Sequence, residues 1–204
     1  MQLIGSYTSP YVRKIRVLLL EKGLPYSFLE DIPWNENTNA PKYNPLGKVP
    51  ILIDENGSVW YDSQVIAQYI EALHSLAPLI PAGDIPAVEV RQLETLADGV
   101  VEAGIAIFLE RKREPTQQNP AWIDRQKGKL TSGLDTLEAK LDGTIWLHAD
   151  TFSLADIATG VMLGWLDLRL PDIDWRKDHP TLTAYGQRLF ARPSFLETLP
   201  PADA

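Results

Sequence analysis

The stretch Asn44-Pro45-Leu46-Gly47-Lys48-Val49-Pro50 leads directly into the apolar run Ile51-Leu52-Ile53. Proline has no N–H to donate to a sheet ladder, so a proline at this place fits the first residues of a strand. Residues 49–54 and 59–61 are therefore predicted to be strands. The turn between them contains Asn56-Gly57, a pair typical of tight β-hairpins.

A strand, a turn and a helix precede this stretch. Residues 2–7 are partly β-prone, and Ser9-Pro10 then has the form of a helix start. One helical face carries the apolar residues that follow, which are Val12, Ile15, Leu18 and Leu19. Gly23 is expected to end this helix in the left-handed conformation. With another strand over residues 26–29 and a helix from about Ser63, the first 76 residues are predicted to form an α/β domain.

The composition changes after this domain. Pro78, Pro81, Gly83 and Pro86 interrupt residues 77–86, which read as a linker. From residue 87 on, apolar residues recur at three-and-four spacing in successive stripes, as expected for helices. The predicted organisation is thus an α/β domain over residues 1–76, a linker over 77–86 and an all-α domain over 87–204.

The composition excludes several classes of function. The chain has 204 residues, with 19 Lys+Arg against 27 Asp+Glu and a formal net charge of −8, which disfavours nucleic-acid binding. It contains no cysteine, so any thiol chemistry must use an imported thiol. No apolar run approaches the length of a membrane span and no signal-peptide layout opens the chain, so a cytoplasmic protein is expected. The three histidines are too dispersed to predict a metal site: His74, His148 and His179.

Three short motifs could carry chemistry, and each also has a purely structural explanation. Ser9-Pro10 could cap a helix, or it could offer a helix N-terminus and a hydroxyl to an anionic ligand. Pro50 could simply begin a strand. Asp62-Ser63 could cap the next helix, with the serine as the capping residue, or could hold a carboxylate.

Taken together, these motifs resemble those of a known family. Ser9-Pro10-Tyr11-Val12 resembles the Cys-Pro-Tyr-Cys motif of glutaredoxins, with Ser9 and Val12 in place of the cysteines. In thioredoxin-like folds the equivalent of Val49-Pro50 carries a cis peptide bond. These motifs, with residues 44–50, a capping box formed by Ser153 and Asp156, and a closing Arg192-Pro193-Ser194, resemble the glutathione transferase family over essentially the whole chain.

The resemblance implies an α/β thioredoxin-like N-terminal domain and an all-α C-terminal domain. It also implies glutathione as co-substrate without a metal, a homodimer and a role in detoxification. Ser9 would be the catalytic residue that contacts the glutathione sulfur. Thr8 and Tyr11 would be the candidates to assist Ser9 there. The implied glutathione-binding residues are Ser9, Asn35, Lys48, Val49, Pro50, Asp62 and Ser63.

The second substrate would meet residues of the helical half. Candidates for this acceptor site are Tyr11, Ile105, Phe108, Arg111 and Trp165, although tryptophans are more often core residues. The predicted function is transfer of glutathione to small electrophilic, largely apolar compounds. The alternative is a non-catalytic glutathione-binding or regulatory protein on the same fold. Glutathione-dependent disulfide reduction is disfavoured, because most family members that perform it use a cysteine. The spacing of Ser153 and Asp156 before an apolar helix predicts a structural capping box rather than a catalytic pair.

Overall fold

A computed structural model describes residues 1–73 and 78–201 of the chain. It contains two compact units. The α/β unit comprises the described residues of 1–79 and 192–204, and the helical unit comprises those of 80–191. None of the helices within the described residues has the length and apolarity needed to cross a membrane.

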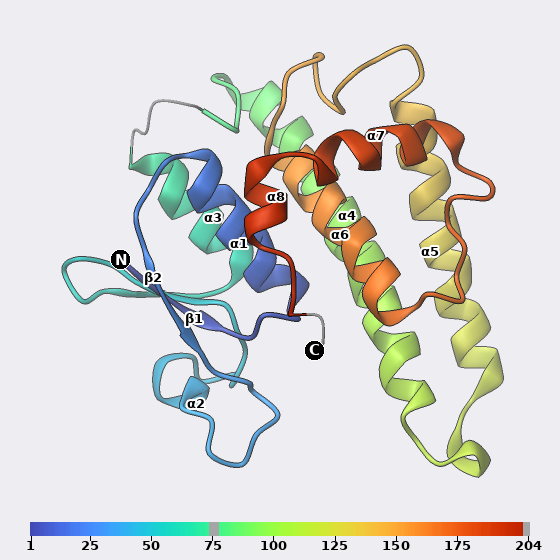
Figure 1. The fold of residues 1–204 in the computed structure, drawn as a ribbon, viewed down its shortest axis with the longest axis horizontal. Coiled ribbons are helices and arrows are strands. Elements are labelled where there is room, and N and C mark those ends of the chain that lie inside the picture. Colours follow the sequence, from blue (N-terminus) through green and yellow to red (C-terminus); the bar gives the residue numbers. More distant parts are fainter. Residues whose placement is uncertain (74–77, 202–204) are drawn as a thin grey trace. The chain divides into compact units, whose positions relative to one another are not determined.

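The sheet of the α/β unit has the strand order β2-β1-β3-β4. Its strands are β1 (Gln2–Gly5), β2 (Ser27–Glu30), β3 (Ile51–Ile53) and β4 (Val59–Trp60). β1 and β2 are parallel and lie side by side in Figure 1, whereas β3 pairs antiparallel with both β1 and β4. The helices of this unit are α1 (Pro10–Glu21), α2 (Ala40–Tyr43), α3 (Ser63–Ala72) and α8 (Pro193–Glu197).

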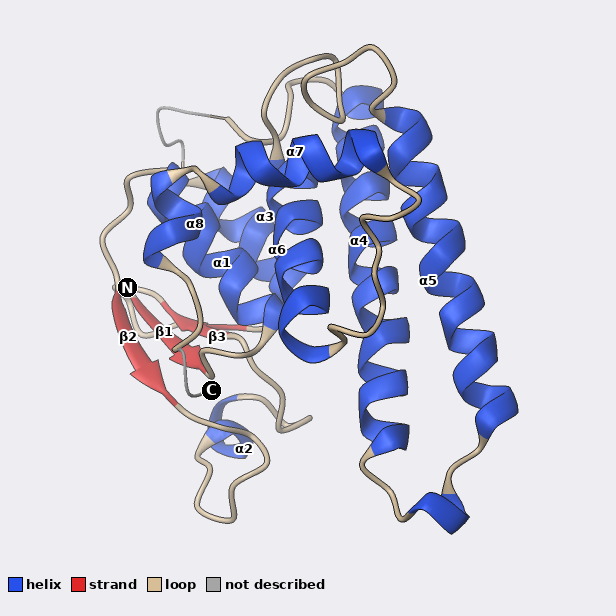
Figure 2. Ribbon diagram, turned by 45° about the vertical axis from the view of Figure 1, so that its right-hand side comes forward, coloured by secondary structure: helices blue, strands red, loops and turns tan. Residues whose placement is uncertain are grey.

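Apolar residues on both faces of the short strands hold these helices. Ile4 and Ile51 pack with Ala40 of α2 in one buried cluster. Their strand neighbours Leu3 and Leu52 are fully buried too, and alternation along a strand turns them to the opposite face. Figure 2 shows α1, α3 and α8 on that face and α2 on the other. The sheet is therefore covered on both sides, which leaves its strand ends as the places where loops gather.

The local signals of the α/β unit are confirmed. Ser9 is the N-cap of α1, and Gly23 follows the helix with a φ of 63°. Gly57, in the predicted hairpin turn, has a φ of 82°. The strands are shorter than predicted, since β1 ends at Gly5 where the chain turns toward Ser9. The helices α2 and α8 were not predicted, because four or five residues are too few to show a helical period.

The end of the chain departs from the predicted domain organisation, because it packs with the α/β unit. Arg13 of α1 donates to the backbone oxygen of Phe195 at 3.2 Å, and Arg16 donates to that of Thr198 at 3.3 Å. Arg192 forms two bonds to the Glu21 carboxylate, at 2.9 and 2.7 Å. These partners lie more than 170 residues apart in the sequence, so no local pattern could have indicated the pairing.

The helical unit is built from α4 (Asp84–Arg111), α5 (Pro120–Lys140), α6 (Leu154–Arg169) and α7 (Pro180–Phe190). α4 begins inside the predicted linker, because Pro86 lies in its first turn, where a proline costs no helical hydrogen bond. α4 packs against both α5 and α6. Gly133 of α5 faces Val100 of α4 so closely that a side chain there would collide with the valine. Gly133 thus permits the close approach of α5 to α4.

The predicted capping box at the start of α6 is confirmed. Asp156 is fully buried and accepts hydrogen bonds from the Ser153 backbone N–H at 2.7 Å and from the Ser153 hydroxyl at 2.8 Å. Its other oxygen accepts from the Leu147 N–H at 3.0 Å and the Tyr185 hydroxyl at 2.8 Å. Burial raises the pKa of Asp156 above its usual value, while the four donors favour the charged form and oppose that rise. The residue therefore ties α6 to the preceding loop and to α7.

A second buried carboxylate closes the β3–β4 hairpin. Asp54 accepts from the Trp60 indole N–H and the Tyr69 hydroxyl, both at 3.1 Å, and from the backbone N–H groups of Asn56 and Ser58, both at 2.9 Å. The hydrogen bond from Trp60, supported by the other three, lowers the pKa of Asp54 to about 2. Asp54 thus joins the hairpin to α3, on which Tyr69 lies.

This pKa predicts an acid-sensitive contribution to stability. The pKa of Asp54 is lower in the folded chain than in the unfolded chain, so ionised Asp54 stabilises the fold. This stabilisation is fully present above the ordinary aspartate pKa of 3.8 and is lost as the pH falls toward about 2. Asp54→Asn is expected to lower the thermal midpoint at neutral pH, and the gap to the unmodified protein should close over that acid range. Thermal unfolding followed by circular dichroism at stepped pH measures it, with the exposed Asp142→Asn as control. A gap that is independent of pH would contradict this role.

Candidate functional site

The sheet register brings the predicted site segments to one end of the sheet. β1 ends at Gly5, which pairs with Glu30 at the end of β2, so the loops toward Ser9 and Asn35 leave from the same end. β3 runs antiparallel to β1, and its first residue Ile51 pairs with Ile4, so Val49-Pro50 enters there too. β4 runs antiparallel to β3 and leads to Asp62. Four separate segments of the sequence thus meet at one end of the sheet.

Ser9 occupies the N-cap of α1. Its hydroxyl oxygen accepts a hydrogen bond from the Val12 N–H at 3.3 Å, and the residue is half-buried. Ser9 therefore caps α1, as its structural explanation predicts, but capping does not occupy every hydrogen-bonding position of the hydroxyl. Capping employs a lone pair of Oγ, so its proton stays available to donate to a ligand. The N-terminal end of the α1 dipole favours a negative charge at the same place.

The Val49-Pro50 peptide bond is cis, as the resemblance implied. Pro50 is buried and Val49 is half-buried. Within residues 1–73 and 78–201, the N–H and C=O of Val49 have no hydrogen-bond partner. A backbone group pair of this kind, beside the end of a sheet, can bond an added extended peptide.

Asn44 holds the loop that presents Val49. Its side chain is 3% exposed, donates to the backbone oxygen of Lys48 at 2.9 Å and accepts from the Leu46 N–H at 3.0 Å. Gly47, with a φ of 61°, completes the turn. Asn44 was missed as a functional residue by sequence reasoning. Its bond to the residue two positions ahead is an Asx-turn, a pattern for which asparagine before a Pro-Leu-Gly sequence is a usable signal.

At the start of α3 the capping residue is Asp62 rather than the expected Ser63. The Asp62 carboxylate accepts from the Gln64 N–H at 2.8 Å. Asp62 is exposed, whereas Ser63 is the first residue of the helix and only 2% exposed. Aspartate has two acceptor oxygens, so the cap leaves capacity for a cationic group of a ligand. The helix N-terminus beside it favours an anionic group.

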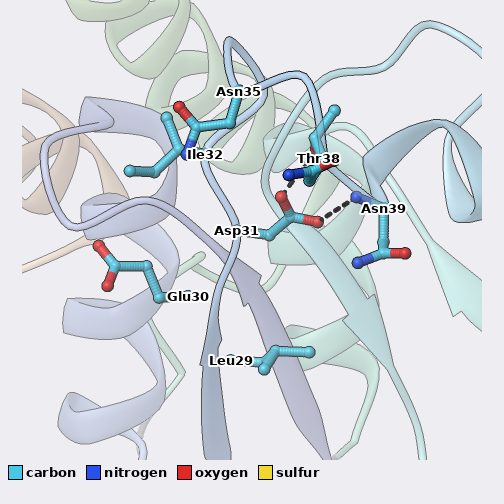
Figure 3. Close-up of a pocket in the computed structure, with 8 residues that line it drawn as sticks. Leu29, Glu30, Asp31, Ile32, Asn35, Thr38 and Asn39 are labelled. Carbon is cyan, nitrogen blue, oxygen red and sulfur yellow. Dashed lines mark hydrogen bonds between the residues drawn. The ribbon is translucent and has the colours of Figure 1, made fainter.

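A pocket of about 310 Å³ lies in the β2–α2 loop, next to the C-terminal end of β2. Figure 3 shows Asp31 at its base, where the carboxylate accepts from the Thr38 hydroxyl at 2.7 Å and from the Asn39 N–H at 2.8 Å. Asn35 lines this pocket, as a ligand-binding role for it would require. Lys48 is exposed, and Tyr11 is half-buried on the first turn of α1.

Among the predicted acceptor residues, those of the helical unit gather on α4 and α6. The Phe108 and Trp165 rings meet edge to face, with centroids 6.4 Å apart. Ile105 lies one turn before Phe108 on α4 and is partly buried. Arg111 is engaged elsewhere, since its guanidinium forms two hydrogen bonds of 2.9 Å with the Asp172 carboxylate. Trp165 is only 6% exposed, which fits a core residue better than a residue of the acceptor site.

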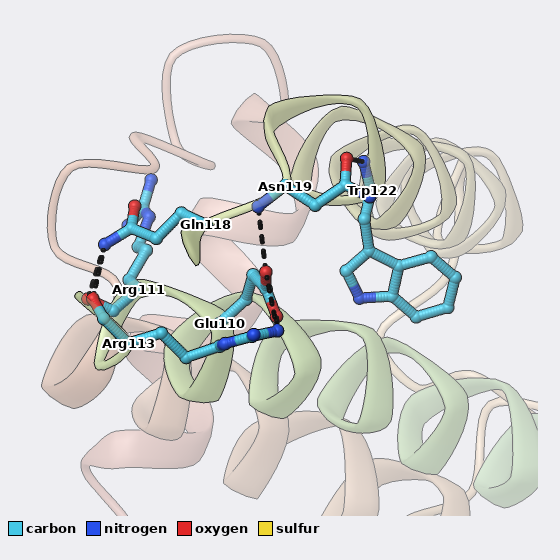
Figure 4. Close-up of polar contacts among 6 residues, drawn as sticks. All are labelled: Glu110, Arg111, Arg113, Gln118, Asn119 and Trp122. Carbon is cyan, nitrogen blue, oxygen red and sulfur yellow. Dashed lines mark hydrogen bonds and ion pairs between the residues drawn. The ribbon is translucent and has the colours of Figure 1, made fainter. Parts of the chain in front are cut away.

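The end of α4 is tied to the start of α5 (Figure 4). Glu110 accepts from the Asn119 N–H at 2.8 Å and pairs with Arg113 at 3.4 Å. Gln118 donates to the backbone oxygens of Arg111 and Arg113, at 3.1 and 2.9 Å. The charged run at the end of α4 is thus organised by pairing and is not a freely solvated segment.

The described residues contain no group of three histidine, cysteine or acidic side chains that could hold a metal ion. The Nε2 atom of His148 lies 3.0 Å from Oε2 of Glu89. His179 is 4% exposed and bonds to the Trp175 carbonyl and to Asp135. His74 lies outside the described residues.

Comparisons with known proteins identify the family of this chain. The family model described as glutathione S-transferase, N-terminal domain, matches residues 8–73, and the corresponding C-terminal domain model matches residues 120–188. The chain is 42% identical over 202 residues to the uncharacterized GST-like protein YibF of Escherichia coli, covering 98% of this chain and 99% of that protein.

Two solved structures are similar over nearly their whole length. A glutathione S-transferase from Methylobacillus flagellatus with glutathione bound has a TM-score of 0.94 and 38% identity, covering 98% of each chain. A glutathione transferase family member from Pseudomonas fluorescens, with bound S-(propanoic acid)-glutathione, has a TM-score of 0.86 and 36% identity, covering 99% of this chain and 100% of that one. The predicted fold class, a thioredoxin-like domain followed by a helical domain, is thereby confirmed. Through both domain models and these relatives, the chain belongs to the glutathione S-transferase family.

Proposed function

We propose that this protein binds glutathione at the end of the α/β sheet and transfers it to small electrophilic, largely apolar compounds. The observation that carries the proposal is the backbone of Val49, whose N–H and C=O have no partner within the described residues, at the strand end where Ser9 and Asp62 also gather. An extended tripeptide can form main-chain hydrogen bonds with these two backbone groups. The glutathione-bound relatives support this proposal, since they share the fold over nearly the whole chain.

Each segment has a distinct role in the proposal. Val49 bonds the cysteinyl backbone, which directs the thiol toward Ser9. Asp62 binds the γ-glutamyl ammonium, and the α3 N-terminus with Ser63 binds the adjacent carboxylate. Asn35 and Lys48 are weaker candidates for the glycyl carboxylate.

The energy available at Ser9 is sufficient for the chemistry. A thiol with a pKa of about 8.5 is roughly 3% ionised at pH 7, and lowering that pKa by about two units requires about 2.7 kcal/mol. A hydroxyl that donates to a charged sulfur supplies about 1.5–3 kcal/mol. The helix N-terminus adds about 0.3–1 kcal/mol. Ser9 on α1 can therefore generate the thiolate without a nearby base.

The rival function is a glutathione-binding or regulatory protein without turnover. It would need the tripeptide contacts but not a hydroxyl at the sulfur. Retention of Ser9 together with Val49 and Asp62 favours the enzyme.

Glutathione titration of the intact protein by calorimetry tests the proposal directly. Binding in the micromolar to low-millimolar range is expected, and the ultraviolet absorbance of the bound thiolate should titrate well below the pKa of free glutathione. Binding with an unshifted thiol would favour the regulatory alternative. Absence of binding would refute both.

Removal of the Asn44 side chain is expected to weaken glutathione binding about threefold to tenfold, because two hydrogen bonds that shape the Val49 loop are lost. Calorimetric titration of Asn44→Ala measures this. Asn44→Asp keeps the acceptor for Leu46 but removes the donor to Lys48, so it should also bind glutathione more weakly. Unchanged affinity in both variants would show that Asn44 does not position the loop.

The homodimer, the cytoplasmic location and the role in detoxification remain predictions. Size-exclusion chromatography with light scattering would test the first of them.

A further inference from the structure

The ring of His179 lies between two hydrogen-bond acceptors of the helical unit. Its Nδ1 atom is 2.6 Å from the backbone oxygen of Trp175, and its Nε2 atom is 2.9 Å from Oδ1 of Asp135. A carbonyl oxygen and an ionised carboxylate can only accept, so the ring makes both bonds only if both of its nitrogens donate. A neutral imidazole has one N–H, whereas the imidazolium has two. The geometry therefore calls for a positively charged ring.

The burial of His179 gives this charge state a structural consequence. The residue is 4% exposed, so a bond that the ring loses is not readily replaced by water. Burial by itself favours the neutral ring and lowers the pKa of His179. The bonds to the Trp175 carbonyl and to Asp135 outweigh burial and raise that pKa above its usual value of 6.5. The ring thus keeps its proton to a higher pH than an ordinary histidine does.

The charged groups that face the ring both come from α5, and they also hold the start of α7. His179 is the N-cap residue of α7, but its side chain makes no capping bond. Glu138 of α5 caps the helix instead, since it accepts from the backbone N–H groups of Thr181 and Leu182 at 2.9 and 2.6 Å. Asp135 and Glu138 are three residues apart and lie on the same face of α5. The first turn of α7 is thus joined to α5 by two carboxylates and one cation.

The remaining charges near the ring are paired with each other. Arg176 forms two hydrogen bonds of 2.6 Å with the Asp167 carboxylate of α6, and the Trp175 indole N–H donates to the same carboxylate at 2.8 Å. In the part of the chain that the structure describes, no cationic side chain except His179 forms an ion pair with either α5 carboxylate. Loss of the His179 proton would leave these two carboxylates on one helix face with no cation between them.

We propose that His179 is a pH-sensitive latch between α5 and α7. With both nitrogens protonated, the ring holds the start of α7 to Asp135. When the ring loses a proton to solvent at alkaline pH, one of its two hydrogen bonds fails and the first turn of α7 loosens. The latch acts within the helical unit and does not depend on the proposed function, so it is tested independently of glutathione binding.

The stability of the protein should depend on this proton. The pKa of His179 is higher in the folded chain, so the protonated ring stabilises the fold; this stabilisation is fully present below pH 6.5 and is lost as the pH rises through the raised value. Asp135→Asn should therefore lower the thermal midpoint by about 2–5 °C at pH 6, and the gap should close at alkaline pH. The Asp135 side chain is 64% exposed, so the substitution leaves the core intact. Asp142→Asn, at an exposed position of the same unit, is the control and should show no gap that changes between pH 6 and pH 9.

Nitrogen NMR of the imidazole ring reads the charge state directly. Two-bond correlations between ring protons and nitrogens distinguish the imidazolium from both neutral tautomers, and the His179 signal is identified by its absence in His179→Gln. The unmodified protein should show the imidazolium at pH 6, and its ring should titrate at a higher pH than the ring of Asp135→Asn. A neutral ring at pH 6, or equal titration in the two proteins, would overturn the proposal.

Hydrogen exchange measures the loosening of α7 itself. After correction for the intrinsic pH dependence of exchange, the amides in the first turn of α7 should exchange about tenfold faster at pH 9 than at pH 6, while those of α4 keep their protection. Asp135→Asn should lose this pH dependence. If the ring titrates while the protection of α7 stays constant, His179 is a buried cation but not a latch, and the proposal is wrong.

Discussion

Replacing Ser9 with alanine is expected to lower kcat/KM for glutathione conjugation about tenfold to hundredfold, because the hydroxyl is the donor that stabilises the developed thiolate. Glutathione affinity should change much less, since the tripeptide backbone is held by Val49 and the γ-glutamyl end by Asp62. Steady-state kinetics with an aryl chloride and calorimetric titration with glutathione measure the two effects. Equal losses in rate and in affinity would contradict the proposed role.

The capping role of Ser9 requires a matched set of variants. Alanine at an N-cap costs about 0.5–2 kcal/mol of stability, whereas glycine costs only a few tenths. Ser9→Gly should therefore be as inactive as Ser9→Ala but more stable. Ser9→Thr keeps the hydroxyl and should retain more activity than either. If activity instead followed the thermal midpoint across the three variants, Ser9 would be a structural residue only.

Replacing Asp156 with alanine is expected to lower the free energy of unfolding by about 3–5 kcal/mol. The substitution leaves four buried donors without their acceptor: the Leu147 N–H, the Tyr185 hydroxyl, and the N–H and hydroxyl of Ser153. Denaturant unfolding followed by circular dichroism measures the loss. A change below about 1 kcal/mol would show that water replaces the carboxylate, as at an exposed site.

Two companion variants separate the network from the charge. Asp156→Asn keeps one acceptor oxygen but turns an amide toward the Ser153 N–H, so an intermediate loss is expected. Asp142→Ala removes an exposed carboxylate of the same unit and should change stability by less than about 0.5 kcal/mol. Both effects are on folding, in keeping with a structural capping box.

Local sequence patterns predicted the elements of this fold well where they were long. Apolar residues at three-and-four spacing predict α1, α3, α4, α5, α6 and α7. Residues that bury one face of a helix recur every three or four positions, so a few turns of sequence are enough to show the pattern. The caps Ser9 and Ser153, and the turns at Gly23 and Gly57, depend only on neighbouring residues and were equally accessible. α2 and α8 were missed because each spans little more than one turn.

The candidate site was predicted in its residues rather than in its assembly. Ser9, Val49 and Asp62 were identified by resemblance, but their meeting at one sheet end depends on the register of β1, β3 and β4. Asn44 was overlooked because its importance comes from burial.

The sequence by itself determined the strand, helix and turn types, the absence of a cysteine of its own, and the motifs that place the chain near the glutathione transferases. Only the tertiary structure decided that Arg192 and the following helix belong with α1, and that Asp62, not Ser63, caps α3. The physical reason is that hydrophobic periodicity specifies which face of an element is buried but not which partner buries it. Partners are chosen by packing and by hydrogen bonds between residues far apart in the chain, such as Arg13 with Phe195.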